Sequence, residues 1–123
     1  MNRIYIVRLK REDGLVIVKF GITSTTIEER LRRTYLPKYG NGVPMFEYFK
    51  HYTPLYDSGL VFSKDQAEQI ELKLKSHKKR DFYTPYGDAG NLDGITEMRY
   101  YDDDLVEQYK MIIEDMKNGI RVA

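Results

Sequence analysis

Apolar and polar residues alternate along two segments near the start of the chain, residues 3–10 and 15–22. A period of two residues is typical of β-strands, in which successive side chains point to opposite faces. The dipeptide Asp13-Gly14 between the two segments is a hairpin signal, because tight hairpin turns need positive φ angles that glycine and, less readily, aspartate adopt. We therefore expect an antiparallel hairpin at the start of the chain.

The alternation also separates the two faces of the second strand. Val18 and Phe20 share one face, whereas Lys19 lies on the other with Ile17 and Gly21. The pattern predicts that Lys19 points away from the face that forms the main core. An exposed lysine that protects a sheet edge from pairing is the structural alternative for this residue.

Three later segments carry apolar residues at the three- and four-residue spacing of amphipathic helices: 27–35, 64–79 and 102–118. Ser63 immediately precedes the second of these segments, and Gln66 follows three residues later. This pair has the spacing of a capping box, which satisfies exposed backbone N–H groups at a helix start. The pattern therefore predicts three helices.

Weaker signals predict short strands at 45–53, 59–62 and 97–101. Residues 80–96 between the second helix and the last of these strands are rich in Gly, Asp, Tyr and Pro. Such a composition favours a long loop, and long loops in compact domains are often functional.

Together these elements predict an α+β fold. A small central antiparallel sheet, formed by the N-terminal hairpin and a third strand, would be flanked by about three helices. The length of 123 residues fits one domain. We expect a single domain over residues 1–123, in which residues 102–123 form an additional C-terminal helix.

The composition excludes several classes of protein. Hydrophobic residues at 41% and charged residues at 32% are typical of globular domains, and no apolar run approaches the ~20 residues of a membrane helix. The chain has no cysteine, which excludes disulfides and thiolate metal sites. The N-terminus has no signal-peptide pattern. We therefore expect a cytoplasmic protein with no membrane partner.

The net charge of +1 is unevenly distributed. Residues 101–123 contain six acidic and three basic side chains, so residues 1–100 carry the positive excess. Basic residues cluster at 30–38 and again at 73–80. Such clusters bind polyanions through counterion release, but basic residues at helical spacing are equally typical of a solvated helix face.

Three residues of the first thirty have the chemistry of a phosphodiester-cleaving site. Tyr5 lies on the first strand, Lys19 on the second, and Arg30 on the helix that follows. A hairpin followed by a helix can bring such residues together, and a long arginine side chain can reach from the helix towards the sheet. Ordinary strand and surface positions are the alternative for each of them.

On the second predicted helix, Glu71 lies at the border of the apolar stripe formed by Ala67, Ile70 and Leu74. A carboxylate beside a core is costly unless it is paired or binds a cation. A metal ligand and a salt-bridged partner of a neighbouring lysine such as Lys75 are the two interpretations.

Several short motifs follow one another along the chain: Ile4-Tyr5, Lys19-Phe20-Gly21, Glu29-Arg30-Leu31, Ala67-x3-Glu71-x2-Leu74 and Gly94-Ile95-Thr96-Glu97. Their order and spacing resemble the GIY-YIG nuclease superfamily, and within it the small phage-type branch in which lysine replaces the tyrosine of the second motif. The resemblance covers residues 3 to about 101 and leaves the final helix uncovered. Arg3 stands where the family has the first glycine of its first motif.

The resemblance implies a metal-dependent endonuclease that hydrolyses phosphodiester bonds in DNA, double-stranded DNA above all. Tyr5 would act as the general base with the assistance of Lys19, and Arg30 would bind the scissile phosphate. Glu71 would hold one Mg²⁺ or Mn²⁺ ion, with Glu97 as a second or alternative ligand. A domain with one active site would need a homodimer to cut both strands cleanly.

Six basic side chains near these motifs are expected to contact nucleic acid: Arg3, Arg33, Lys38, Lys75, His77 and Lys78. For His77 an incidental position is the alternative. Two other functions stay open, a catalytically inactive nuclease-like module that binds nucleic acid or protein, and a scaffold that uses the acidic last helix as a protein-contact face. Convergence of Tyr5, Lys19, Arg30 and Glu71 on one pocket is what separates the nuclease from both.

Overall fold

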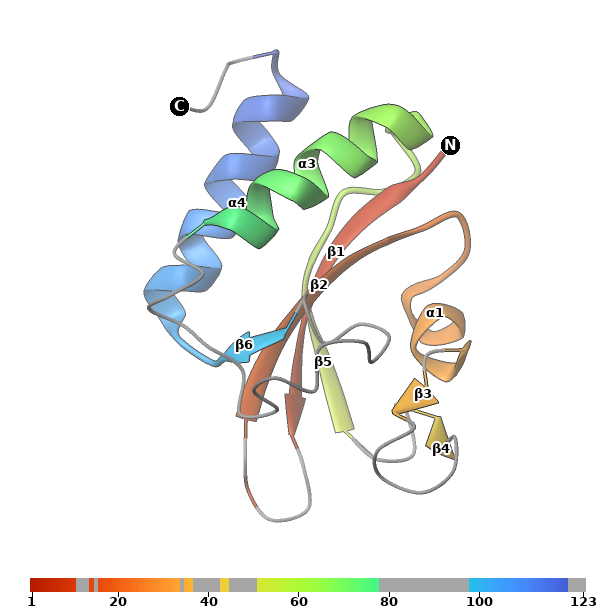
Figure 1. Cartoon of the computed structure of the whole chain (residues 1–123), viewed down its shortest axis with the longest axis vertical. Coiled ribbons are helices and arrows are strands. Elements are labelled where there is room, and N and C mark those ends of the chain that lie inside the picture. Colours follow the sequence, from red (N-terminus) through yellow and green to blue (C-terminus); the bar gives the residue numbers. More distant parts are fainter. Residues whose placement is uncertain are drawn as a thin grey trace.

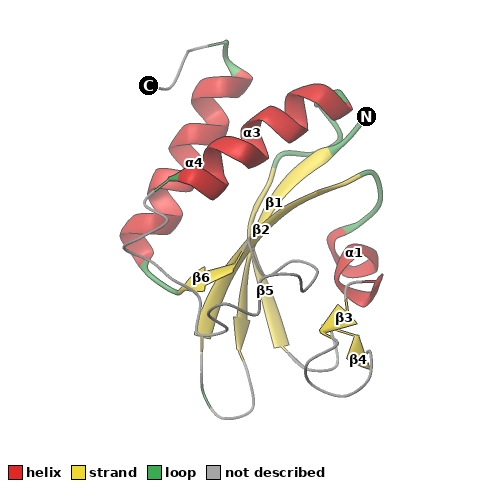
Figure 2. Ribbon diagram, in the orientation of Figure 1, coloured by secondary structure: helices red, strands yellow, loops and turns green. Residues whose placement is uncertain are grey.

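The computed structural model describes residues 1–10, 14, 16–33, 35–36, 43–44, 51–77 and 98–119. Its elements follow one another as β1 (Arg3–Lys10), β2 (Val16–Thr23), α1 (Ile27–Arg33), β3 (Tyr35–Leu36), β4 (Val43–Pro44), β5 (His51–Asp57), α3 (Lys64–Ser76), β6 (Met98–Tyr100) and α4 (Asp103–Lys117) (Figure 1). This is the α+β fold that the sequence predicts, an antiparallel sheet flanked by helices (Figure 2).

The main sheet has the strand order β5-β1-β2-β6, and β3 and β4 form a separate two-stranded sheet. All neighbouring strands are antiparallel. The predicted hairpin is confirmed, since β1 and β2 pair in continuous register from Arg3 opposite Thr23 to Lys10 opposite Val16. Gly14 in the turn has a φ of 91°, the left-handed conformation that glycine adopts without strain.

The third long strand was misplaced by the sequence pattern. It was expected at 45–53, but β5 begins at His51 and ends at Asp57, and residues 45–50 lie outside the described residues. β5 contains Pro54, which a strand at the edge of a sheet tolerates. The strand expected at 59–62 is reduced to one bridge between Phe62 and Asn2.

One face of the sheet carries the main core. Ile4, Ile6, Val18 and Phe20 point to this face and pack against α3 and α4, which lie together on one side of the sheet (Figure 1). The rest of this core comes mainly from the buried faces of the two helices: Ala67, Ile70, Leu74, Leu105, Val106, Tyr109, Ile112 and Ile113. The apolar stripes that the sequence predicted for these helices are therefore the buried ones.

The opposite face of the sheet is buried as well. It carries Tyr5, Lys19 and the apolar residues that alternate with the main core, and α1 lies on this side with Ile27 and Leu31 buried (Figure 1). Lys19 does point away from the main core, but it is not the exposed edge lysine of the structural alternative, because 0% of its surface is exposed. The central strands are thus covered on both faces, as in layered α/β structures.

α1 ends earlier than the sequence predicts. A helix was expected up to residue 35, but α1 ends at Arg33, and Tyr35–Leu36 forms the short strand β3. The backbone N–H of Glu29 donates to the hydroxyl of Thr26 at 3.2 Å, which caps the start of the helix.

The capping box of α3 is confirmed. The hydroxyl of Ser63 accepts from the backbone N–H of Gln66, and the side chain of Gln66 accepts from the N–H of Ser63. The helix ends at Ser76, three residues before the predicted end, with His77 as its C-cap. The strand expected at 97–101 is present as β6, and the loop expected at 80–96 lies outside the described residues.

α4 runs from Asp103 to Lys117, close to the predicted helix. The side chain of Asp102 accepts from the backbone N–H of Leu105 at 2.9 Å and caps its start. Acidic residues in its first turn suit the positive end of the helix dipole. Gly119 follows the helix with a φ of 78°, as glycine commonly does beyond a helix end.

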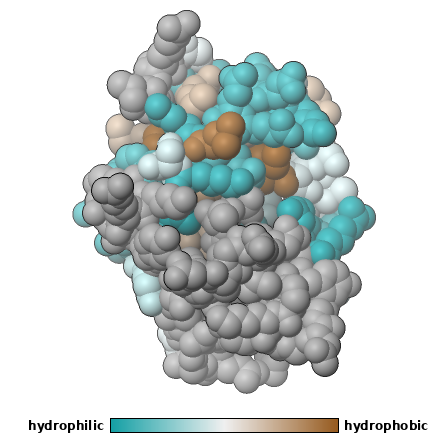
Figure 3. Space-filling model, viewed as in Figure 1, coloured by the Kyte–Doolittle hydropathy of each residue, from teal (hydrophilic) through white to brown (hydrophobic). Residues whose placement is uncertain are grey.

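The described surface is mainly hydrophilic on the face shown in Figure 3, where the more apolar residues form small separate spots. Among the described helices, none is both long enough and apolar enough to cross a membrane.

Candidate active site

The structure brings Tyr5 and Lys19 into direct contact. The ammonium nitrogen Nζ of Lys19 donates a hydrogen bond to the phenol oxygen Oη of Tyr5 at 3.1 Å, and lies 3.4 Å from the carbonyl oxygen of Phe20. The hairpin register explains this contact. Lys19 is paired with Val7, two residues along β1 from Tyr5, so the two side chains are diagonal neighbours on one face.

Gly21 provides the space in which the Tyr5 ring lies. Gly21 is the residue directly opposite Tyr5 in the hairpin. A Cβ atom added to Gly21 would lie 2.5 Å from Oη of Tyr5 and 2.7 Å from Cζ, far inside van der Waals contact. Glycine therefore leaves room for the phenol at this position, and any larger side chain would displace it.

Both members of the pair are fully buried. Tyr5 and Lys19 each have 0% of their surface exposed. The burial holds the ammonium beside the phenol, within 5.3 Å of the ring centroid. It also means that a water molecule or a phosphate can reach Oη of Tyr5 only after the residues that cover it have moved.

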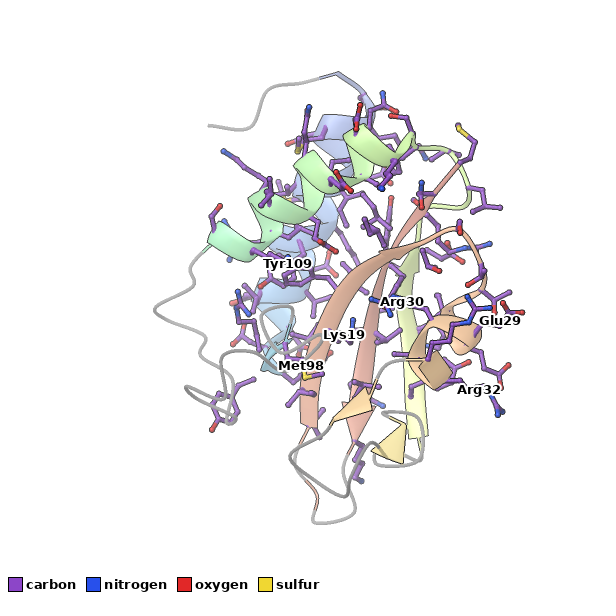
Figure 4. All side chains as sticks on the ribbon, turned by 45° about the vertical axis from the view of Figure 1, so that its right-hand side comes forward. Lys19, Glu29, Arg30, Arg32, Met98 and Tyr109 are labelled. Carbon is purple, nitrogen blue, oxygen red and sulfur yellow. The ribbon has the colours of Figure 1, made fainter. Side chains whose placement is uncertain are left out.

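Arg30 extends from α1 towards the same side of the sheet. Figure 4 shows its side chain directed from the helix to the strands, on the side where Lys19 lies, whereas Glu29 and Arg32 point away from the sheet. The burial agrees with the view, because Arg30 is half-buried while Glu29 and Arg32 are exposed. Arg32 forms an exposed ion pair with Glu28 at 3.0 Å, which occupies the outer face of the helix.

Glu71 lies at the border of the buried stripe of α3, where the sequence pattern puts it. Its side chain is 15% exposed, whereas Glu68 on the outer face is exposed. Oε1 of Glu71 forms an ion pair with Nζ of Lys75, one turn later, at 3.3 Å. The salt-bridged interpretation is therefore realised in this structure.

α3, which carries Glu71, packs on the face of the sheet with Ile4 and Phe20, whereas Tyr5 and Lys19 lie on the opposite face. β6 pairs with β2 only from Ile17 to Lys19, so within the described sheet residues 20–23 of β2 have no strand on that side. α3 contacts both β2 and β1. Tyr5, Lys19 and Arg30 therefore share one side of the sheet, and Glu71 belongs to the helix layer on the other side.

The basic residues expected to bind nucleic acid are in different situations. Arg33 is exposed on α1, 4.0 Å from a carboxylate oxygen of Glu29, and Lys75 pairs with Glu71. His77 lies 2.6 Å from the side-chain oxygen of Gln108 and links the end of α3 to α4. Three further predicted residues lie outside the described residues: Lys38, Lys78 and Glu97.

Arg3, which stands in place of the family's glycine, forms an ion pair with Asp57. Nη1 of Arg3 is 2.7 Å from Oδ2 of Asp57, and Oδ1 of Asp57 accepts from the backbone N–H of Gly59 at 2.8 Å. Asp57 lies directly opposite Tyr5, on β5. No pattern in the sequence singled out Asp57, because the strand was expected at 45–53 and not at His51–Asp57.

A second residue that the sequence did not single out is Arg99 on β6, which is buried. Its guanidinium donates to the carbonyl of Lys75 at 3.0 Å and to that of Met98 at 2.8 Å, and lies 5.8 Å from the ring centroid of Phe20. Arg99 thereby joins the last turn of α3 to the sheet. This contact fixes the half of the helix that carries Glu71 and Lys75.

Tyr109 of α4 is buried in the main core. Its ring makes an edge-to-face contact with Phe20, with 5.2 Å between centroids. Its hydroxyl has no hydrogen-bond partner in the described part of the chain. Burial raises the pKa of Tyr109 to about 12, an effect that the nearby charge of Arg99 opposes. The phenol is therefore neutral at physiological pH and contributes to packing.

The described residues contain no group of three or more histidine, aspartate or glutamate side chains that could hold a metal ion. A single carboxylate is nevertheless a usual protein contribution to a Mg²⁺ site, because water and substrate oxygens supply the remaining ligands. The half-buried carboxylate of Glu71 fits such a site, provided that Lys75 gives way.

Comparisons with known proteins add no relative. No protein-family model matches the chain, and neither the curated proteins nor the solved structures include a significant match.

Proposed function

We propose that the chain is a metal-dependent endonuclease that hydrolyses phosphodiester bonds in DNA, with double-stranded DNA as the expected substrate. The observation that supports this most directly is the hydrogen bond from Lys19 to Tyr5, on the side of the sheet towards which Arg30 extends. A phenol, an ammonium and a guanidinium within one region are the groups that attack on a phosphodiester requires, a proton acceptor and positive charge.

In this proposal each side chain has one task. Tyr5 accepts a proton from the attacking water, and the ammonium of Lys19 holds its phenol oxygen in place through the 3.1 Å hydrogen bond. Arg30 binds two oxygens of the scissile phosphate, because a planar guanidinium matches them better than an ammonium does. Its position on α1 is stable because Leu31, the next residue, is buried against the sheet side of the helix.

Glu71 is the proposed ligand of a single Mg²⁺ or Mn²⁺ ion. A bound ion of this kind would supply positive charge at the phosphate and lower the pKa of a bound water. Lys75 holds the carboxylate in the free protein at 3.3 Å, so in this proposal the divalent ion displaces its ammonium when it binds.

The test is cleavage of labelled duplex and single-stranded DNA in Mg²⁺ or Mn²⁺ by the protein and its variants. Glu71→Gln and Tyr5→Phe should each reduce the rate by about 100-fold or more, since each removes a group that acts on the reacting atoms. Glu68→Gln, an exposed glutamate three residues earlier on the same helix, is the matched control and should leave the rate unchanged. Equal rates for the protein and Glu71→Gln would attribute the cleavage to a contaminant.

A second candidate is a nuclease-like module that binds nucleic acid without cutting it. The complete burial of Tyr5 and Lys19 favours this function, as does the pairing of Glu71 with Lys75. Duplex binding in EDTA with no cleavage in any divalent ion would establish the module and exclude the enzyme. Nicking of one strand by a monomer, with double-strand cleavage only at higher protein concentration, would support a nuclease that acts as a homodimer.

A further inference from the structure

The pair of Arg3 and Asp57 joins β1 to β5 on the face of the sheet that carries Tyr5. Arg3 and Tyr5 are two residues apart on β1 and therefore share a face, while Asp57 is the residue opposite Tyr5 on β5. Residues directly opposite one another in an antiparallel pair have neighbouring side chains. The Arg3–Asp57 pair therefore lies on the face of the sheet that carries Tyr5, on the β5 side of β1, whereas Oη of Tyr5 lies over Gly21 on the β2 side.

The donors of Arg3 are only partly used. Nη1 donates to Oδ2 of Asp57 at 2.7 Å, but Nε is buried and has no hydrogen-bond partner within the described residues. A guanidinium has five N–H donors arranged to bind two oxygens at once. An anion that offered two or three oxygens would satisfy Arg3 better than the single oxygen of Asp57 does.

Asp57, in turn, does not depend on Arg3. Its second oxygen, Oδ1, accepts the backbone N–H of Gly59 at 2.8 Å, so the carboxylate keeps a partner when Arg3 leaves. Both side chains are accessible, with 18% of Arg3 and 37% of Asp57 exposed. The ion pair is therefore one that an incoming anion can replace without stranding a buried charge.

We propose that Arg3 and Asp57 form a phosphate-exchange site. When nucleic acid binds, Arg3 leaves Oδ2 of Asp57 and donates to the non-bridging oxygens of a backbone phosphodiester, while Asp57 stays on the N–H of Gly59. The carboxylate holds the guanidinium in place in the free protein and competes with the phosphate for it. The inference rests on the proposed function only for its ligand, since it requires binding and not cleavage.

The experiment measures binding of a short fluorescent DNA duplex by anisotropy in EDTA, so that cleavage plays no part. The variants are Asp57→Asn, Arg3→Met and the double variant. Asparagine keeps an acceptor for Gly59 but removes the competing charge. The matched control is Glu107→Gln on α4, which also releases a basic side chain, Lys110, from an ion pair of 3.2 Å.

Asp57→Asn should bind the duplex about two- to fivefold more tightly than the control variant does, which is the factor that corresponds to an ion pair of up to ~1 kcal/mol. Arg3→Met should weaken binding and lower the slope of log affinity against log salt by about one, the value for one phosphate contact. In the double variant the gain from Asp57→Asn should vanish. Thermal unfolding of each variant checks that it is folded.

The proposal would be overturned if Asp57→Asn and Glu107→Gln changed the duplex affinity equally. It would also be overturned if Asp57→Asn still raised the affinity in the Arg3→Met background. If Asp57→Asn does not fold, an unchanged affinity and salt slope in Arg3→Met would overturn it alone. The nuclease proposal is judged separately, by cleavage in Mg²⁺. If the binding assay shows the exchange but no cleavage occurs, this inference holds and the nuclease proposal fails. If DNA is cleaved but the exchange is absent, the nuclease proposal holds and this inference fails.

Discussion

Replacing Gly21 with alanine tests the structural basis of the Tyr5–Lys19 pair. The new Cβ would lie 2.5 Å from Oη of Tyr5, whereas ordinary contact begins at about 3.4 Å, so the end of the phenol must move by about 0.9 Å. Both residues are buried, which leaves the ring little room to move. The displacement also disturbs the 3.1 Å hydrogen bond from Lys19.

The expected cost follows from these contacts. Overpacking of a buried site costs ~1–3 kcal/mol, and weakening a hydrogen bond to a charged group adds to it. The alanine offsets ~0.4–1 kcal/mol by restricting the unfolded chain. We therefore expect Gly21→Ala to lower the free energy of unfolding by about 2 kcal/mol, and the melting temperature by roughly 8 °C for a chain of this length.

Urea unfolding of Gly21→Ala in two backgrounds provides the assay. Tyr5→Leu removes the atoms that the alanine meets, so in that background Gly21→Ala should cost nothing or be slightly stabilising. The double-mutant cycle then gives a coupling energy of about 2 kcal/mol. An equal cost of Gly21→Ala in both backgrounds would show that the clash with the phenol is not its cause, and the reasoning would fail.

Two further predictions concern buried polar groups. Tyr109→Phe should be neutral or stabilising by up to ~1 kcal/mol at neutral pH, because the hydroxyl has no hydrogen-bond partner in the described part of the chain. Burial raises the pKa of Tyr109 to about 12, above the unfolded value of about 10, so the unfolded chain loses this proton first. Ionisation of Tyr109 therefore leaves the free energy of unfolding unchanged below pH 10 and lowers it as the pH rises to 12. Between pH 10 and 12 the urea midpoint of Tyr109→Phe should therefore fall less steeply with pH than that of the unmodified protein. Equal slopes would show that the pKa of Tyr109 is not raised by folding. Arg99→Met should lower the free energy of unfolding by ~1–3 kcal/mol, because it leaves the carbonyl of Lys75 without its donor. An unchanged urea midpoint would show that this bond is not needed to hold α3 on the sheet.

The features that the sequence predicted correctly depend on near neighbours. The hairpin of β1 and β2 follows from alternation and the turn at Gly14, and the start of α3 follows from the capping box of Ser63 and Gln66. In each case the residues that determine the structure lie within one turn or one hairpin. Such local signals need no knowledge of the rest of the fold.

The features that the sequence missed depend on distant partners. Arg3 meets Asp57 across 54 positions, and Arg99 meets the carbonyl of Lys75 across 24. The register of β5 on β1 decides the first contact, and no local pattern fixes it. The alternation of apolar and polar residues in β2 also did not predict that Lys19 is buried. It identifies the face on which Lys19 lies but not the layer that covers this face.

The candidate site was predicted in part. The sequence supplied the chemistry of Tyr5, Lys19 and Arg30, and the hairpin register explains why the first two touch. Glu71 lies at the border of its helix, as the helical spacing predicts, but its pairing with Lys75 depends on side-chain geometry. Whether these residues cleave DNA stays a prediction.

The central hairpin is enclosed between two layers, so one pair of strands serves both the main core and the candidate site. The same strand pair supplies Ile6 and Phe20 to the main core and Tyr5 and Lys19 to the candidate chemistry, each from its own face. Selection on the proposed chemistry and selection for a stable fold would therefore act on adjacent positions of one hairpin. A substitution that loosens the packing on one face would also disturb the other face. We therefore expect the sequence of this hairpin to change more slowly than the rest of the chain.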